Sequence, residues 1–342
     1  MVGGMRARTL LVPLVVVSAL SGAVLVVACA GRGGARAAVS KVEVKGRWAA
    51  SQGLRITAFG GPGGPVTLTR GHRDWKPVWS PDGGQLAFFR TSRDRGPFVD
   101  WQADLWVVNV DGSGERRLTA ANGRDFNPTW TRDGTRRIVF NRYGTGGEPD
   151  RCEVWTIAPD GAPGSEVRVS SPAHRFEWAN AGLGDGRLFV DVTDFSAPGG
   201  AVMRSFLLSP VPGGQGRYEE IARPTPALWH KLSVSPTETK VAYMLDRTGD
   251  LADYRDDVLY WAELDLETRS VKNPVRITDP TGGRCVNEYP RWSADETLIL
   301  FDSSCSGPPR VYAYRLSDGA IAPVSPAAGE PVMFPCAEGV PQ

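Results

Sequence analysis

The sequence predicts an all-β protein, a six-bladed β-propeller of four-stranded antiparallel blades whose last blade is closed by strands from both termini. Two observations predict this fold: a repeat of about fifty residues, and a composition rich in turn residues, with 40 glycines and 27 prolines among 342 residues. Closely spaced turns are typical of many short strands and not of a helical bundle. The formal net charge of +1 also argues against a nucleic-acid-binding protein, which normally carries a basic surplus.

The first 28 residues are expected to be a lipoprotein signal peptide. Arg6 and Arg8 precede an uncharged run from Thr9 to Ala28, and Cys29 follows directly after the sequence VVA. This ending resembles a bacterial lipobox, in which the cysteine receives the lipid. We therefore expect a lipid on Cys29, a flexible tether over residues 29–40 and an extracytoplasmic domain beyond it. An uncleaved transmembrane anchor is the alternative, since about twenty apolar residues can span a bilayer.

Residues 41–342 are expected to form the propeller. Each repeat begins with an apolar strand, a turn and a second strand, as in PVWSPDGGQLAFF at 77–89 and PTWTRDGTRRIVF at 128–140, 51 residues later. Alternating β-branched and aromatic residues around Asp-Gly turns indicate hairpins. Further copies of this first half lie at 180–190, 232–244 and 290–301.

A second hairpin follows each of these copies, as in Leu105–Val108 and Arg116–Thr119. One additional second half stands at the front of the domain, within residues 41–69, and its missing inner strand is expected in Pro331–Pro335. The simplest closure is therefore a last blade built from both ends of the chain. Such a closure removes the exposed sheet edges of an open array.

The repeats resemble those of TolB-type propellers, whose units are WD40-like. The resemblance rests on PVWSPDGGQLAFF followed by ADLWVVNVDGSGERRLT, and it extends from Val39 to Pro341, with the poorest match where Ala181 replaces the tryptophan. It implies a six-bladed ring in an extracytoplasmic setting. It implies no single activity, because relatives include partner-binding scaffolds and propellers fused to peptidases. The chain departs from TolB itself in carrying a lipobox and in lacking an α/β domain before the propeller.

The candidate ligand-binding residues precede the innermost strands, at the expected mouth of the central channel. The repeat register places all of them on one rim, and histidines with carboxylates are groups that hold a metal ion or a polar ligand. Their spacing follows no compact metal motif, so we expect no cofactor unless these side chains converge on calcium or a transition metal. Separate loop positions around the ring are the alternative. The residues are His72, Asp74, Trp75, Asp125, His174, Glu177, His230 and Glu288.

The tryptophans fall into two groups. Trp79, Trp130 and Trp292 recur at repeat spacing and are expected to pack between blades. The others of interest lie off these positions, where an aromatic ring can stack on a sugar or anchor a partner. They are Trp75, Trp101, Trp178 and Trp229.

Four cysteines follow Cys29 and allow three pairings. An even number outside the cytoplasm suggests disulfide bonds. Cys285 and Cys305 flank the first hairpin of the fifth repeat, so we expect this pair to be bonded. Cys152 and Cys336 map to opposite faces, and we expect both to be free.

The sequence contains no nucleophile elbow, HExxH motif or phosphate-binding glycine loop. We therefore expect a monomeric, non-catalytic scaffold of the bacterial cell envelope, which is tethered to a membrane through Cys29 and binds an envelope protein or polymer. Loop aromatics supply affinity in such a scaffold, and loop charges supply specificity. The alternative is a carbohydrate-active propeller enzyme, of the lyase or glycosidase type, with its site at the channel mouth.

Overall fold

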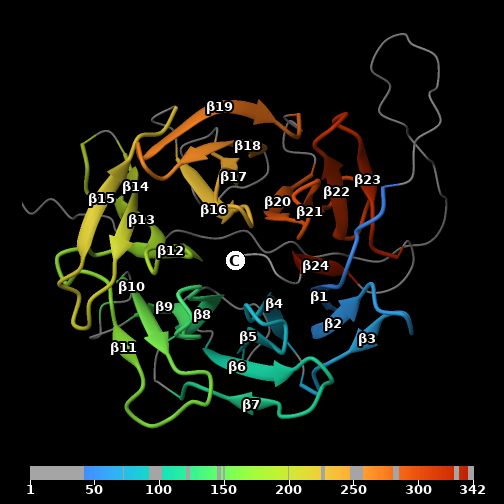
Figure 1. Ribbon diagram of the computed structural model, residues 1–342, viewed down its shortest axis with the longest axis horizontal. Coiled ribbons are helices and arrows are strands. Elements are labelled where there is room, and N and C mark those ends of the chain that lie inside the picture. The colour runs from blue at the N-terminus through green and yellow to red at the C-terminus, as the bar shows by residue number, and fades with distance from the viewer. Residues whose placement is uncertain are drawn as a thin grey trace, which may run out of the picture.

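The computed structural model describes residues 42–71, 73–91, 102–120, 124–144, 148, 151–198, 200–224, 228–246, 257–279, 285–326 and 331–337. Strands make up the regular elements of these ranges, and they surround a central axis as a β-propeller (Figure 1). No helix within these ranges is long and apolar enough to cross a membrane. The expected signal peptide, tether and lipidated Cys29 lie outside the described residues.

Three of the sheets are built from four strands that are consecutive in the chain and antiparallel to their neighbours. The first strand of each sheet lies nearest the axis, and the fourth lies at the outer edge (Figure 1). These strands are β12 (Glu177–Gly182), β13 (Leu188–Asp194), β14 (Val202–Ser209) and β15 (Arg217–Ile221); β16 (Trp229–Val234), β17 (Lys240–Leu245), β18 (Val258–Asp265) and β19 (Ser270–Arg276); and β20 (Asn287–Trp292), β21 (Leu298–Ser303), β22 (Arg310–Arg315) and β23 (Ile321–Pro323).

A fourth sheet joins the two ends of the described chain. Its inner strand, β24 (Val332–Ala337), pairs antiparallel with β1 (Trp48–Gln52), and Trp48 lies opposite Ala337. Strands β2 (Arg55–Phe59) and β3 (Val66–Thr67) complete it on the outside. The C-terminal part of the chain therefore supplies the inner strand and the N-terminal part supplies the outer three, the arrangement expected for the closing blade.

The expected number of six separate blades is wrong: within the described ranges, the ring contains four separate four-stranded blades. The remaining eight strands form one continuous sheet, because a parallel bridge between Ala103 and Arg124 joins its two halves. The sequence repeat predicts the hairpins inside each half, but it carries no signal for this backbone contact between them. The strands of this sheet are β4 (Asp74–Trp79), β5 (Gln85–Thr91), β6 (Ala103–Asn109), β7 (Arg116–Arg117), β8 (Arg124–Trp130), β9 (Ile138–Tyr143), β10 (Cys152–Ile157) and β11 (Val167–Arg168).

The hydrophobic core fills the spaces between neighbouring inner and middle strands around the ring. The repeat-spaced tryptophans Trp79, Trp130 and Trp292 are buried there, as their spacing predicts. Each indole N–H donates to a backbone carbonyl of the preceding inner strand, at 3.3, 3.2 and 3.1 Å respectively. These hydrogen bonds connect neighbouring parts of the ring and hold the inner strands in place around the axis.

Candidate functional site: the central channel

The pairing of each described inner strand contains an irregularity, and in five of the six strands it lies at the same point of the repeat. Register shifts interrupt the pairing of β4, β8, β12, β16 and β20 with the next strand, and of β24 with β1. A β-bulge changes the direction in which a side chain points, and bulges are common beside functional sites. Five of these strands place a non-glycine residue with positive φ at the irregularity, namely Lys76 (48°), Asn127 (54°), Lys231 (54°), Tyr289 (55°) and Phe334 (57°). We call these five residues the bulge ring.

Side chains of the bulge ring meet across the axis although they come from separate strands. Lys76 Nζ donates a hydrogen bond to Asn127 Oδ1 at 2.9 Å and lies 4.3 Å from the centroid of the Tyr289 ring. Lys231 Nζ lies 3.7 Å from the same centroid. The Phe334 ring packs edge-on against Tyr289, with centroids 4.5 Å apart. Two ammonium groups therefore lie against one aromatic ring. The ring attracts each cation, whereas the two cations repel each other.

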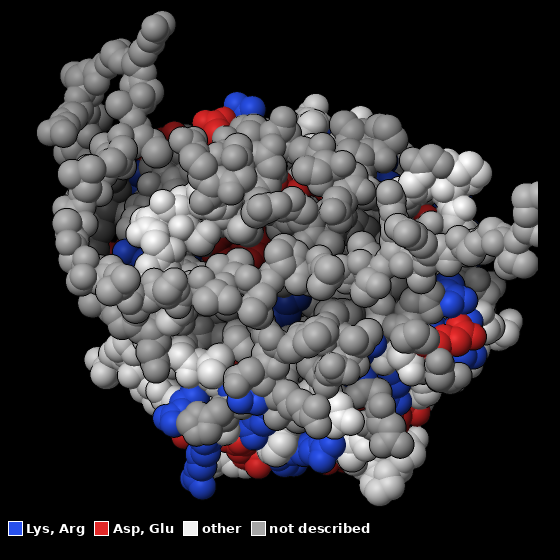
Figure 2. Space-filling model, turned by 180° about the vertical axis from the view of Figure 1, so that it is seen from behind, with Lys and Arg blue, Asp and Glu red and all other residues white. Residues whose placement is uncertain are grey.

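The positive charges of this layer exceed the acidic groups paired with them. Lys231 Nζ lies 3.4 Å from Glu288, whereas the guanidinium of Arg291, from the same strand as Glu288, donates to the backbone carbonyls of Leu232 and Pro290 at 3.3 Å. Within the described ranges, neither Lys76 nor Arg291 has a carboxylate at ion-pair distance. Figure 2 shows a basic side chain in the central depression of one face.

Burial and mutual repulsion change the titration of these groups. Burial, together with the charges of Lys231 and Arg291, holds the pKa of Lys76 well below its usual value. Burial also lowers the pKa of Arg291. The nearby Asp302 is buried and accepts two hydrogen bonds from the backbone N–H of Phe334, at 2.9 and 2.8 Å, yet burial raises its pKa well above the usual range. Burial therefore disfavours the charged form of the Asp302 carboxyl.

A cavity of about 10 Å³ lies beside this layer, between β4, β8, β20 and β24. Such a cavity has room for a single water-sized group. Polar and aromatic side chains line it together with three prolines. The lining residues are Lys76, Pro77, Val78, Asn127, Pro128, Tyr289, Arg291, Phe334 and Pro335.

Two of the acidic residues expected at the channel mouth form ion pairs inside the eight-stranded sheet. Asp74 is fully buried and accepts hydrogen bonds from Arg90 at 2.5 and 3.0 Å, and Asp125 accepts from Arg142 at 2.7 and 2.8 Å. Each arginine lies directly opposite its aspartate on the adjacent strand. Each aspartate therefore neutralises an arginine of the neighbouring strand, and the two aspartates do not form a common site.

The described histidines also bind carboxylates of their own sheets. His174 Nδ1 lies 3.0 Å from Glu177 Oε2, and the hydroxyl of Tyr218 donates to Glu177 at 2.8 Å. His230 Nε2 lies 2.7 Å from Asp257 Oδ2. The structure therefore does not bring these histidines to one site, and the described ranges contain no group of three or more metal-ligating side chains.

The remaining candidates have different positions. Trp75 and Glu288 lie directly before bulge-ring residues, and Trp75 packs edge-on against Phe334 with centroids 5.9 Å apart. His72 and Trp101 lie outside the described residues. The centroid of the Trp178 ring lies 5.8 Å from Lys76 Nζ. Trp229 is fully buried and stacks on a tyrosine, which leaves it no surface for a ligand.

The disulfide Cys285–Cys305 is present, and it is the pair expected from the sequence. Cys152 and Cys336 are buried free thiols. The bond ties the start of β20 to the segment after β21, so it braces the strand that carries Tyr289 and Arg291.

No family model matches the chain. A local sequence similarity and the fold both indicate a resemblance to TolB. A 68-residue segment, 20% of this chain, is 41% identical to the Tol-Pal system protein TolB of Zymomonas mobilis and covers 13% of that protein. The fold resembles the crystal structure of TolB from Acinetobacter baumannii, with a TM-score of 0.59, 14% identity and coverage of 85% of this chain and 66% of that one. The chain is a β-propeller that resembles TolB in its fold and in this segment.

The TolB-like propeller shares this fold with proteins of other kinds. Kuenenia stuttgartiensis hydrazine synthase matches with a TM-score of 0.62 and 15% identity, over 89% of this chain and 47% of that one. At such identities the solved structures show the fold alone. The matched segments also span less than a fifth of the first curated relatives' own lengths.

The sequence contains a signal for the bulge ring of this TolB-like propeller that the search for histidines and carboxylates missed. Four of its five residues stand directly before a proline of the inner strand; the pairs are Lys76-Pro77, Asn127-Pro128, Tyr289-Pro290 and Phe334-Pro335. Proline has no N–H to donate, so it is tolerated where a bulge interrupts the ladder. In four of the five strands, the residue before the repeated proline is therefore the bulge-ring residue.

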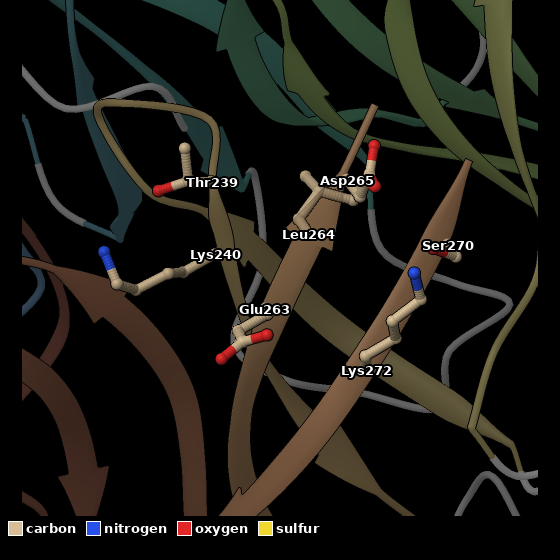
Figure 3. Close-up of a pocket in the computed structure, with 7 residues that line it drawn as sticks. All are labelled: Thr239, Lys240, Glu263, Leu264, Asp265, Ser270 and Lys272. Atoms are coloured by element: carbon tan, nitrogen blue, oxygen red, sulfur yellow. The ribbon is translucent and has the colours of Figure 1, made fainter. Parts of the chain in front are cut away.

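A larger hollow of about 360 Å³ lies away from the channel, near the turn that joins β18 to β19. Figure 3 shows its charged side chains pointing in different directions, with Lys240 on one side and Lys272 on the other. Lys240 forms an ion pair with Glu296 at 3.0 Å. This hollow therefore has no convergent polar groups, and the channel is the better candidate site.

Proposed function

We propose that this TolB-like propeller is a non-catalytic binding scaffold of the bacterial cell envelope, which holds a protein partner at the mouth of its central channel. The observation that carries the proposal is the bulge ring, in which five inner strands present polar and aromatic side chains to one axis. A closed ring holds these groups in place before binding, which lowers the entropic cost of association. The curated relatives are described as Tol-Pal system proteins, which supports a protein as the partner.

The proposal includes a monomeric propeller that is attached to a membrane by a lipid on Cys29. The lipobox and the uncharged run before it support this attachment. Substitution Cys29→Ser should move the protein from the membrane fraction to the soluble fraction of the same cells. Equal amounts of wild type and variant in the membrane fraction would contradict the lipid anchor and favour a transmembrane one.

Site-specific photo-crosslinking in intact cells tests the partner. A photo-reactive amino acid replaces Glu288, whose side chain is 26% exposed at the channel, or Arg217 on outer strand β15, whose side chain is 75% exposed. We expect one envelope protein to be crosslinked from position 288 and not from position 217. Identical adducts from both positions, or no adduct from position 288, would overturn the proposal.

No specific observation within the described ranges favours the carbohydrate-active alternative. Its expected acid–base groups, such as Glu177 and His174, form hydrogen bonds inside one sheet. We therefore propose the binding scaffold alone.

A further inference from the structure

Three basic side chains lie close together in the channel layer. Lys76, Lys231 and Arg291 approach one another around Tyr289, and within the described ranges Glu288 is the carboxylate that forms an ion pair with this group. Bringing like charges together in a partly buried place costs free energy. A purely structural position would be filled more favourably by a neutral side chain.

The backbone adds to this cost. Lys76 and Lys231 have positive φ angles of 48° and 54°, a conformation that residues with a Cβ adopt infrequently. Strained conformations and unfavourable charges that persist at one place are characteristic of functional sites. Asn127, Tyr289 and Phe334 share this conformation, so the bulges set the direction of the side chains, and the charges of the two lysines point to an anionic ligand.

We propose that the bulge ring binds a carboxylate group of the partner, with Lys76 and Lys231 as its ion-pair donors. The inference deepens the proposed function and rests on it, because it names the chemical group that the channel recognises. The adjacent cavity of about 10 Å³ accepts one water-sized group, which is the size of a single carboxylate oxygen. Arg291 lines that cavity and supplies donors, Asn127 holds the Lys76 ammonium group beside it, and Tyr289 and Phe334 supply flat apolar walls.

Binding of the carboxylate is coupled to protonation of Lys76. The charged groups that face its ammonium group are Lys231 from β16, Glu288 and Arg291 from β20, and Asp302 from β21. A bound carboxylate adds the negative charge that favours the protonated amine, so the protein takes up protons on binding. The affinity therefore falls as the pH rises through the depressed pKa of Lys76.

Isothermal titration calorimetry on the full chain, purified in detergent, tests the inference with defined probes. The probes are hexaglutamate with an amidated C-terminus, a neutral hexaserine with a free C-terminal carboxylate, succinate, and sodium sulfate. We expect hexaglutamate or hexaserine to bind, which distinguishes a side-chain carboxylate from a terminal one, and succinate to bind more weakly. Sulfate binding as tight as that of the carboxylates would overturn the assignment to a carboxylate.

Variants locate the binding. Lys76→Met and Lys231→Met should each weaken binding about tenfold or more, because each removes one ion-pair donor from a partly desolvated site. Lys240→Met is the matched control, since this lysine pairs with Glu296 outside the channel, and it should leave the affinity within about twofold. Lys76→Gln, which keeps a donor for Asn127, replaces Lys76→Met if the latter fails to fold. Unchanged affinity in the channel variants, or equal loss in the control, would overturn the inference.

The two proposals fail in different ways. Carboxylate binding that is lost in Lys76→Met, without a crosslink from position 288, would keep the carboxylate site and overturn the envelope partner. A specific crosslink without carboxylate binding would keep the scaffold and overturn the inference. Two buffers of different ionisation enthalpy measure proton uptake in the same titrations, and the absence of uptake would overturn the coupling to Lys76.

Discussion

Trp292 and Trp229 provide a matched test of the indole hydrogen bonds that connect the ring. Both side chains are fully buried, and they belong to the inner strands of neighbouring sheets. The indole N–H of Trp292 donates to the carbonyl of Ser233 at 3.1 Å. The indole N–H of Trp229 has no hydrogen-bond partner within the described ranges. Substitutions Trp292→Phe and Trp229→Phe remove the same atoms, but only the first breaks a hydrogen bond.

The magnitude follows from what the two substitutions share and where they differ. Both leave a void in a close-packed core, and this loss costs each variant about 2 kcal/mol of unfolding free energy. Trp292→Phe also takes a donor from a buried carbonyl, which adds about 1 to 2 kcal/mol. Trp229→Phe removes a donor that was buried without a partner, so it carries no such addition. We expect Trp292→Phe to be the more destabilising by about 1 to 2 kcal/mol.

Equilibrium urea unfolding followed by circular dichroism measures both variants against the wild type at one pH. Comparable slopes in urea allow the midpoints to be compared as differences in stability. Equal losses in the two variants would show that the lost volume decides the cost and that the hydrogen bond to Ser233 contributes nothing. A larger loss in Trp229→Phe would refute the reasoning altogether.

Three further predictions concern the cysteines and one buried acid. Replacing both Cys285 and Cys305 by alanine should lower the unfolding free energy by about 3 kcal/mol, because the bond closes a loop between residues 20 apart; an unchanged urea midpoint would contradict this. The thiols of Cys152 and Cys336 should react with Ellman's reagent at pH 8 only after unfolding, because both are buried and burial raises the pKa of Cys336 to about 12; rapid labelling of the native protein would contradict their burial. Burial raises the pKa of Asp302, so the folded state binds its proton more tightly than the unfolded state, and stability should fall as the pH rises from about 4 through the raised pKa. Asp302→Asn should remove this part of the pH dependence in thermal melts, and a wild-type pH profile in the variant would exclude Asp302 as its source.

The local structure was predictable because it depends on neighbours in the sequence. Turn residues at short intervals and alternating apolar residues predict the hairpins, and the spacing of Trp79, Trp130 and Trp292 predicts their burial between blades. The pairing of β24 with β1 was predictable from a count of half-repeats at the two ends. The bridge from Ala103 to Arg124 was not, because no repeat signal reports a contact between the edges of two units.

The position of the candidate site was predictable from the sequence, but only some of its residues were. The inner strands were expected to surround a channel, and Trp75 and Glu288 lie next to it. Asp74 and Asp125 were expected there as well, but each lies opposite an arginine of the next strand and forms an ion pair with it. These two carboxylates therefore neutralise arginines within the sheet, and the sequence analysis overlooked Lys76 and Lys231.

The sequence by itself determined the hairpins, the closure by both termini and the tryptophan packing, because these follow from alternation, turn chemistry and repeat spacing within one or two units. Only the tertiary structure decided that Lys76, Lys231 and Tyr289 meet at the axis. These residues belong to strands far apart in the chain, and their convergence depends on ring closure together with a bulge in each inner strand. A side chain turned by a bulge departs from strict alternation, so no period in the sequence reports where it points.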